Sequence, residues 1–248
     1  MIDVLKQSLI IIPAFNEEAA LPGLLQEVRQ AAPATDIVVI NDCSDDRTGD
    51  VARRHGAAVL DLPCNLGVGG AVQAGFRYAS TRDYRYVIRC DGDGQHPPAE
   101  IPKLVAAMQT GQFDLVVGSR FLDDDSYENT FLRHIGIRGL ALMLSVICRA
   151  RISDPTSGFQ MLNRPIFCCF AHSYPLDYPE PESIALLRRQ GYRFGEVATR
   201  FRARMTGKSS IESWGALYYM IKVILALFVD RARTVDPRFA RHNMEDSP

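Results

Sequence analysis

The chain has 248 residues, of which 47% are hydrophobic, and its 28 basic and 29 acidic side chains leave a net charge of −1. This length suits one α/β domain with a small C-terminal attachment. The near-zero charge argues against a nucleic-acid-binding protein that works by bulk electrostatics.

Short β-branched runs alternate with amphipathic stretches through the first half of the chain. This pattern predicts an α/β fold with a mostly parallel central sheet flanked by helices. We expect strands at residues 8–13, 36–41, 57–62, 86–90 and 115–118, and helices at 17–31, 47–55, 68–80 and 99–110. Further along we expect a loop at 123–129, a helix at 130–149, sheet residues at 153–162, a helix at 182–190 and a strand at 193–201. Each early strand ends in a polar cluster, and because ligands bind beyond the carboxyl ends of parallel strands, these clusters predict one shared site.

The sharpest signal is the segment DGDG, directly after the apolar strand YVIRC. Asp91 and Asp93, two residues apart on a turn, can face one cation, and Mg²⁺ and Mn²⁺ prefer carboxylate and diphosphate oxygens. Gly92 and Gly94 let the backbone approach a diphosphate without a Cβ clash. An ordinary Asp-Gly turn is the alternative interpretation. His96 could help to hold the metal or an aspartate, or it could only satisfy local hydrogen bonds.

The segments PAFNEE and NDCSDDRT follow the first two strands. Pro13, Phe15 and Glu17 can form a slot for a nucleobase, with an apolar platform and a carboxylate acceptor. Alternatively, Glu17 only complements the dipole of the following helix. Asp42 suits hydrogen bonding to a base or a ribose, as acids at the ends of such strands do in nucleotide-binding folds.

Two other loops are interpreted as local structure. Ser44 and Asp45 are predicted to cap the helix that follows the second strand. The segment NLGVGG is similar to a Gly-rich phosphate loop but lacks the G-x-G-x-x-G spacing after a strand, so we expect a close backbone turn and a helix start.

Taken in chain order, these segments continue as NLGVGGAVQAGF, DGDGQHPPAEI, VVGSRF, DPTSGFQ and a late GKSS. The set resembles the family 2 glycosyltransferases, enzymes of the GT-A fold that use nucleotide-sugar donors. Within that family the chain is most similar to the dolichol-phosphate mannosyltransferase-like, or polyprenyl-phosphate sugar transferase, branch. The resemblance covers about residues 8–233, and although each motif alone is weak, the ordered set is specific.

The resemblance implies a role for each matching residue. It implies that the nucleotide is held by Pro13, Phe15, Glu17 and Asp42. It implies that the metal is bound by Asp91 and Asp93, with Gln95 nearby. It implies that phosphates of the donor or acceptor are met by Arg120, Arg202 and Lys208, and that Asp154 and the residues after it line the acceptor side. Asn41 departs from the family pattern, which often has an acid at that place.

The resemblance also implies a metal-dependent, inverting transfer of a sugar from a GDP- or UDP-sugar, with Mg²⁺ or Mn²⁺ as the cofactor. A polyprenyl phosphate acceptor is already anionic near neutral pH and needs no strong base. A sugar hydroxyl, the alternative acceptor, needs a carboxylate to take its proton, for which Asp154 and Glu182 are candidates. A sugar-1-phosphate nucleotidyltransferase fits less well, because PAFNEE lacks the Gly-rich loop with Arg and Lys. A non-catalytic binding protein would tolerate loss of the two metal acids, which this chain keeps.

The C-terminal region predicts attachment to a membrane surface. We expect a catalytic domain at 1–212, an amphipathic helix at 213–233 and a disordered tail at 234–248. The apolar run 214–229 contains Lys222 and is shorter than the roughly 20 residues of a spanning helix. Its aromatic start and basic end favour an interfacial helix, with burial in a homo-oligomer as the alternative. Without a secretory leader or paired cysteine spacing, we expect reduced thiols and a cytoplasmic protein, peripheral on a membrane.

Overall fold

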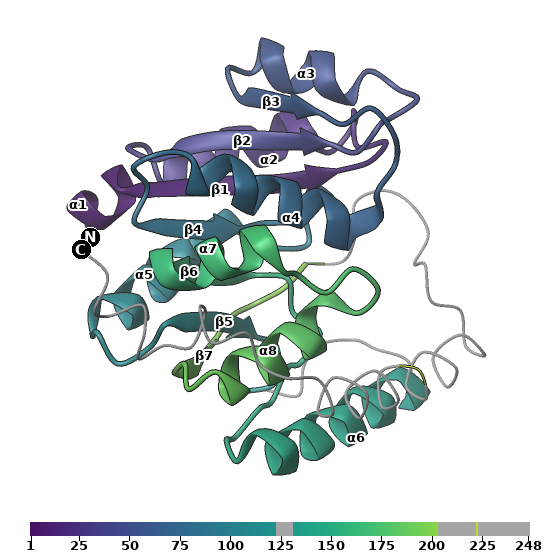
Figure 1. Cartoon of the computed structure of the whole chain (residues 1–248). Helices are drawn as coiled ribbons and strands as arrows, with labels where there is room; N and C mark the ends of the chain where they lie inside the picture. Colours follow the sequence, from purple (N-terminus) through teal and green to yellow (C-terminus); the bar gives the residue numbers. More distant parts are fainter. Residues whose placement is uncertain (123–130, 203–221, 223–248) are drawn as a thin grey trace.

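A computed structural model describes residues 1–122, 131–202 and 222, except for the side chains of 131–135. In this part of the chain one seven-stranded sheet has the order β3-β2-β1-β4-β6-β5-β7 (Figure 1). The strands are β1 Ser8–Ala14, β2 Asp36–Asn41, β3 Ala58–Asp61, β4 Tyr86–Arg89, β5 Leu115–Ser119, β6 Gln160–Asn163 and β7 Phe194–Ala198. Only β6 among them runs antiparallel to its neighbours, β4 and β5. The predicted α/β fold with a mostly parallel sheet is confirmed.

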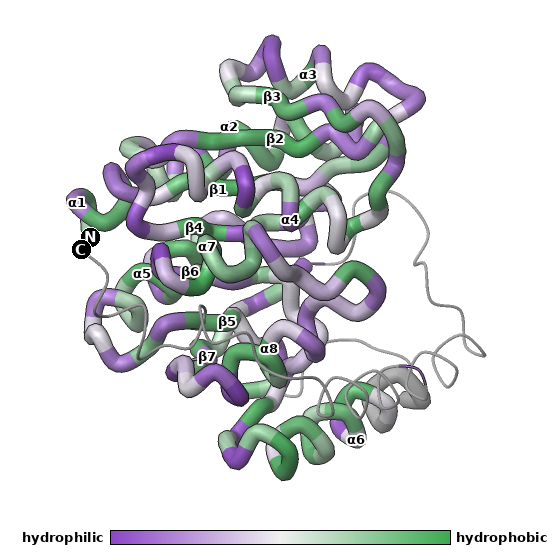
Figure 2. The backbone as a smooth tube through the Cα atoms, in the orientation of Figure 1, coloured by the Kyte–Doolittle hydropathy of each residue, from purple (hydrophilic) through white to green (hydrophobic). Residues whose placement is uncertain are grey.

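Helices cover both faces of this sheet (Figure 1). One face packs against α4 Gly67–Ser80, α6 Phe131–Cys148, α7 Arg164–His172 and α8 Pro179–Arg189. The other packs against α1 Ile2–Lys6, α2 Leu21–Ala31, α3 Thr48–Arg54 and α5 Ile101–Gln109, which follows the short 3₁₀ turn η1 Pro98–Glu100. Strands that are buried on both faces are near-continuous apolar runs. In β1, Ile11 faces the first helix layer and Ile12 the second, and Figure 2 shows β2 hydrophobic over most of its length.

Several element boundaries differ from the predictions for physical reasons. The helix expected from residue 17 begins at Leu21, because the amides of Glu17 and Glu18 donate to Thr48 Oγ1 and Asp46 Oδ2 instead of starting a helix. Strand β6 is shorter than the predicted 153–162, and α8 begins three residues before the predicted 182. Helices α1 and α7 were not predicted. In α7, Asn163 Oδ1 accepts from the amide of Ile166, so the helix starts directly at the end of a strand.

The predictions for the loop at 123–129, the helix at 213–233 and the tail at 234–248 lie outside the described residues, Lys222 excepted, as does the boundary at 212. Within the described part of the chain, no helix is both long and apolar enough to cross a membrane.

Candidate active site

The carboxyl ends of β1, β2 and β4 lie side by side and bring the predicted motifs to one edge of the sheet. Ala14 at the end of β1 pairs with Asn41 at the end of β2. Directly beyond these ends, the amide of Asp42 donates to Ala14 O at 2.9 Å, and the amide of Gly92 donates to Pro13 O at 3.2 Å. The shared edge that the strand pattern predicted is therefore present.

The loops PAFNEE and NDCSDDRT hold each other through cross-loop hydrogen bonds. The amide of Asn16 donates to Ser44 Oγ at 3.0 Å, and the amide of Asp45 donates to Asn16 Oδ1 at 2.8 Å. The predicted capping of α3 by Ser44 and Asp45 is wrong, because its N-cap is Arg47, which makes no side-chain capping bond. The two residues join the loops instead.

The four predicted nucleotide-binding residues gather on these loops. Phe15 is 44% exposed, whereas Asp42 is only 3% exposed and Pro13 is buried at the end of β1. Glu17 is half-buried. The carboxylate of Asp42 accepts from the amide of Leu66 at 2.7 Å, so it also fixes the start of the next loop.

The segment NLGVGG forms a tight turn and the start of α4, as predicted. Gly67 has φ +73°, a value that favours glycine. A Cβ on Gly69 would lie 2.4 Å from the carbonyl oxygen of Leu176, so only glycine fits this close approach. Gly69 thus allows the contact between α4 and the loop before α8.

Asp91 and Asp93 follow β4 at this edge. The Asp91 side chain is 28% exposed, and Asp93 is 6% exposed with its Oδ1 accepting from the amide of Gln95 at 3.0 Å. Among the described residues, no group of three or more His, Cys, Asp or Glu side chains could hold a metal ion alone. Mg²⁺ commonly binds one or two carboxylates together with substrate phosphates and water. Two carboxylates beside a diphosphate therefore fit a divalent cation.

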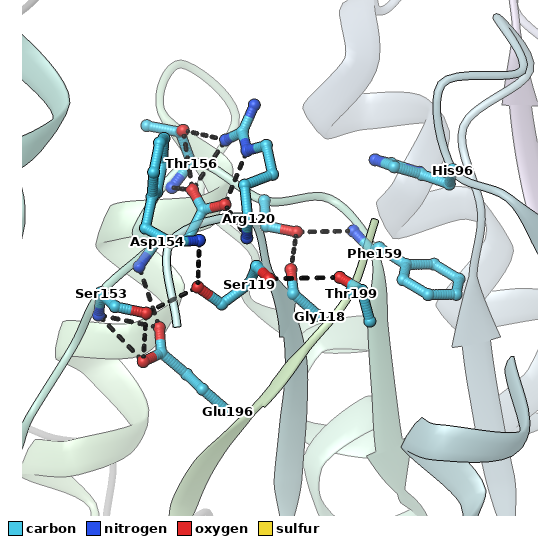
Figure 3. Close-up of polar contacts among 12 residues, drawn as sticks. His96, Gly118, Ser119, Arg120, Ser153, Asp154, Thr156, Phe159, Glu196 and Thr199 are labelled. Atoms are coloured by element: carbon cyan, nitrogen blue, oxygen red, sulfur yellow. Dashed lines mark hydrogen bonds and ion pairs between the residues drawn. The ribbon is translucent and has the colours of Figure 1, made fainter. Parts of the chain in front are cut away.

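His96 holds the backbone of this segment. The Asp91 amide donates to His96 Nδ1 at 3.0 Å, which assigns the ring proton to Nε2, 3.8 Å from Asp91 Oδ2. The His96 ring stacks on that of Phe159, with the ring centroids 5.4 Å apart (Figure 3). Phe201 meets the His96 ring edge-on, with the centroids 5.0 Å apart. Burial lowers the pKa of His96, against the opposing charges of Asp91 and Asp93. The imidazole is thus a neutral support for the DGDG segment.

A buried arginine that the sequence reading missed lies directly behind Asp91. Arg89 is 1% exposed; its Nε lies 3.0 Å from Asp91 Oδ1 and its Nη1 2.7 Å from Glu180 Oε1. Burial alone lowers the pKa of Arg89, but Asp91 and Glu180 raise it, and the balance leaves it above the ordinary value. The signal in the sequence was a charged residue in an otherwise apolar strand, YVIRC.

Arg120 and Asp154 form a bidentate ion pair (Figure 3). Arg120 Nε lies 2.6 Å from Asp154 Oδ2 and Nη2 lies 2.7 Å from Oδ1. Nη2 also donates to Thr156 Oγ1 at 2.7 Å, and the Arg120 amide donates to Asp154 Oδ2 at 3.1 Å. Both side chains are buried. The structure therefore brings these two predicted site residues together.

Glu196 on β7 supports this pair from behind (Figure 3). Its carboxylate accepts from the amide and the hydroxyl of Ser153, and from the amide of Asp154 at 3.0 Å. Burial raises the pKa of Glu196, although these hydrogen bonds oppose the shift. Sequence reasoning missed this residue, because an isolated acid in a strand belongs to no motif.

Of the two late basic residues, the structure describes Arg202 but not Lys208. The Arg202 amide donates to Gln95 O at 3.0 Å, which places Arg202 beside the predicted metal segment. Its Nη1 donates to both carboxylate oxygens of Glu27 on α2, each at 2.8 Å. Lys208 lies outside the described residues.

Comparison with known proteins identifies the family of the chain. Residues 9–170 match the family described as Glycosyl transferase family 2. The chain belongs to this family. It is therefore a glycosyltransferase, as the ordered motifs implied.

This family 2 glycosyltransferase has relatives over most of its length. It is 32% identical over 211 residues to an undecaprenyl-phosphate mannosyltransferase of Micrococcus luteus, covering 82% of this chain and 80% of that protein. It is 28% identical over 214 residues to a polyprenol monophosphomannose synthase of Mycolicibacterium smegmatis, covering 84% and 76%. A glucosyl-3-phosphoglycerate synthase of Mycobacterium tuberculosis, solved with Mn²⁺ and UDP, shares the fold, with a TM-score of 0.67, 19% identity and coverage of 95% and 84%.

Proposed function

We propose that this glycosyltransferase moves a sugar from a GDP- or UDP-sugar to a polyprenyl phosphate, with inversion at the anomeric carbon. The observation that carries the proposal is the 32% identity, over 82% of the chain, to an undecaprenyl-phosphate mannosyltransferase. A second relative named for a polyprenol product supports the same acceptor class. Both names contain mannose, which is therefore the first sugar to test.

The donor is proposed to bind along the loops after β1, β2 and β4. Phe15 offers an exposed ring and Glu17 and Asp42 offer carboxylates to the nucleoside. Asp91 and Asp93, with Gln95 beside them, are proposed to hold Mg²⁺ or Mn²⁺. When bound, this cation supplies charge neutralisation for the departing nucleoside diphosphate. The glycines of DGDG leave room for the backbone to come close to that diphosphate.

Arg120 and Lys208 are proposed to bind phosphates of donor or acceptor. Asp154 accepts hydrogen bonds from two nitrogens of Arg120 and so fixes the orientation of its guanidinium. Arg202, beside Gln95, is proposed to assist from the other side of the metal segment.

The engagement of Asp154 supports a phosphate acceptor over a sugar hydroxyl. Its two oxygens accept from the Arg120 side chain and amide, and from Thr156. The oxygens of Asp154 are thus already engaged by donors of the protein itself, which leaves this carboxylate badly placed to act as a base on a sugar hydroxyl. A polyprenyl phosphate oxygen is already ionised, so displacement at the anomeric carbon needs no base.

We further propose that the protein works as a peripheral protein on the cytoplasmic face of a membrane, since a polyprenyl phosphate cannot leave the bilayer. The apolar run 214–229 with its basic end is the proposed contact. A homo-oligomer built on the same run is the competing arrangement.

The test is incubation with Mn²⁺ or Mg²⁺ and a panel of GDP- and UDP-sugars, with and without undecaprenyl phosphate. We expect nucleoside diphosphate release that requires metal and rises with the lipid, together with a glycosylated lipid on thin-layer chromatography. Release that depends on a sugar acceptor and not on the lipid would contradict the proposed polyprenyl phosphate acceptor. Release without metal would contradict the proposed metal-binding role of Asp91 and Asp93.

A further inference from the structure

Arg89 lies between two carboxylates that come from opposite parts of the fold. Asp91, two residues further along the chain, contacts Nε at 3.0 Å, and Glu180, in the first turn of α8, lies 2.7 Å from Nη1. The Arg89 side chain is 1% exposed and that of Glu180 14%, so water screens these charges little. Neither Arg89 nor Glu180 belongs to the predicted site, yet Arg89 contacts Asp91, a proposed metal ligand.

The buried guanidinium competes with any cation for the charge of Asp91. A guanidinium with one carboxylate neighbour tends to close on it through two parallel hydrogen bonds. Here the contacts are shared, since Nε goes to Asp91 and Nη1 to Glu180. Glu180 also carries a negative charge that balances the positive charge of Arg89. The negative charge of Asp91 is then not fully neutralised by Arg89.

The surroundings keep this arrangement in place. The residue opposite the pair is Gly158, where a Cβ would lie 2.7 Å from Asp91 Oδ2 and 2.9 Å from Arg89 Nη2. Helix α8 begins with Pro179 and packs on the sheet through Ile184 and Leu187. The position of Glu180 is therefore set by the docking of a helix and not by a loop.

We propose that Glu180 is a positioning residue for the divalent cation: by sharing Arg89, it keeps Asp91 able to bind the metal. This inference rests on the proposed metal site at Asp91 and Asp93. It adds a long-range contribution from α8, an element outside the D-x-D segment.

The test measures Mn²⁺ uptake by the full chain, from the loss of the free Mn²⁺ signal in electron paramagnetic resonance, with GDP or UDP present and a nucleotide-only blank subtracted. Glu180→Gln removes one charge with almost no change of shape. We expect it to raise the Kd for Mn²⁺ at least tenfold. Glu180→Asp keeps the charge and should stay within about threefold of wild type.

Two further variants separate charge from folding. Asp114→Asn alters a buried acid, paired with Arg193 at the opposite edge of the sheet, and should leave Mn²⁺ affinity unchanged while it lowers stability. The double variant Arg89→Met/Glu180→Gln removes the competitor together with its partner and should bind Mn²⁺ more tightly than Glu180→Gln alone. If Glu180→Gln does not fold, the double variant is compared with wild type, and its Kd for Mn²⁺ should stay within about threefold of the wild-type value.

The outcomes distinguish the inference from the function on which it rests. Wild type that binds Mn²⁺, with binding lost in Asp93→Asn and unchanged in Glu180→Gln, overturns only the role of Glu180. A double variant no tighter than Glu180→Gln overturns the competition argument. Wild type that takes up no Mn²⁺ removes the metal site and the inference together.

Discussion

Arg120 and Asp154 are 34 residues apart in the sequence, yet their side chains meet through two contacts of 2.6 and 2.7 Å. The pair joins the end of β5 to the segment before β6, and Glu196 fixes that segment from β7. The ion pair and the hydrogen bonds to Glu196 thus together link three neighbouring strands of the sheet.

The first prediction concerns the stability of this pair. Asp154→Asn leaves the buried Arg120 without its counter-charge and should lower the free energy of unfolding by about 3 kcal/mol. Urea denaturation of wild type and variant measures the difference. Asp45→Asn, an exposed acid, is the matched control and should stay within about 0.5 kcal/mol. Equal midpoints for Asp154→Asn and wild type would contradict the prediction.

The second prediction concerns the backbone behind Asp91. Gly158→Ala forces a Cβ to within 2.7 Å of Asp91 Oδ2, so Asp91 must move and metal-dependent transfer should be lost. The stability cost should be about 1–3 kcal/mol, as for other overpacked interiors. Gly23→Ala in α2 has no atom within 4 Å of its new Cβ and should stabilise the protein by about 0.5–1 kcal/mol. Normal transfer by Gly158→Ala would show that Asp91 tolerates displacement.

The third prediction concerns the late basic segment GKSS. Lys208→Ala should reduce transfer at least tenfold while the free energy of unfolding changes by less than about 0.5 kcal/mol. The reason is that we expect a lysine beside a glycine in this polar segment to pack little and to close over phosphates. Lys6→Ala, which removes an exposed lysine from α1, is the control for the lost charge. Sugar transfer by Lys208→Ala at the wild-type rate would show that the GKSS segment has no role in phosphate binding.

The fourth prediction concerns the membrane. The full chain should float with liposomes that contain anionic lipid. It should be released as the salt concentration rises, because salt screens the attraction between the basic end of 213–233 and the anionic headgroups. Neutral liposomes are the control. Protein that never floats, yet forms a stable oligomer that dissociates on Leu225→Asp, would favour burial of this run against a second subunit.

The fifth prediction concerns the cysteines. Cys43 and Cys64 are exposed, whereas Cys90 and Cys148 are buried. Burial raises the pKa of the Cys90 thiol and raises that of Cys148 to about 11, so both stay protonated near pH 8 and lack the reactive thiolate. Brief alkylation followed by peptide mass spectrometry should modify Cys43 and Cys64 first, and the buried pair only after unfolding. Early modification of Cys90 would mean that the end of β4 opens readily.

The sequence predicted the parts of the site that are local in the chain. The acids of DGDG, the acid after β2 and the turn at Gly67 each follow a strand, so strand pattern alone located them. Glu180 and Glu196 could not be found in this way. Each acts on a residue brought near by sheet order and helix docking, and the local pattern around a single acid carries no information about that neighbour.

The same limit explains the misassigned cap. Ser44 is a residue type that commonly begins helices, and only the presence of the PAFNEE loop opposite diverts its hydroxyl to Asn16. Helix α2 begins late for the complementary reason, since the amide of Glu17 is occupied by Thr48. In both cases hydrogen bonds between the two loops replace the helix start that the local sequence favours.

The position of β6 between β4 and β5 has a consequence for how the chain can assemble. The backbone pairings that join β1, β2, β3 and β4 to one another use no residue beyond Arg89, whereas the other edge of β4 pairs with the later strand β6. Strand β5, however, pairs with β6 and β7 and not with β4. A nascent chain that has reached only Ser119 therefore carries a strand with no partner, and the edge of β4 is open to other chains. Closure waits for residues synthesised later, so the slow, aggregation-prone interval of biogenesis falls in the second half of translation.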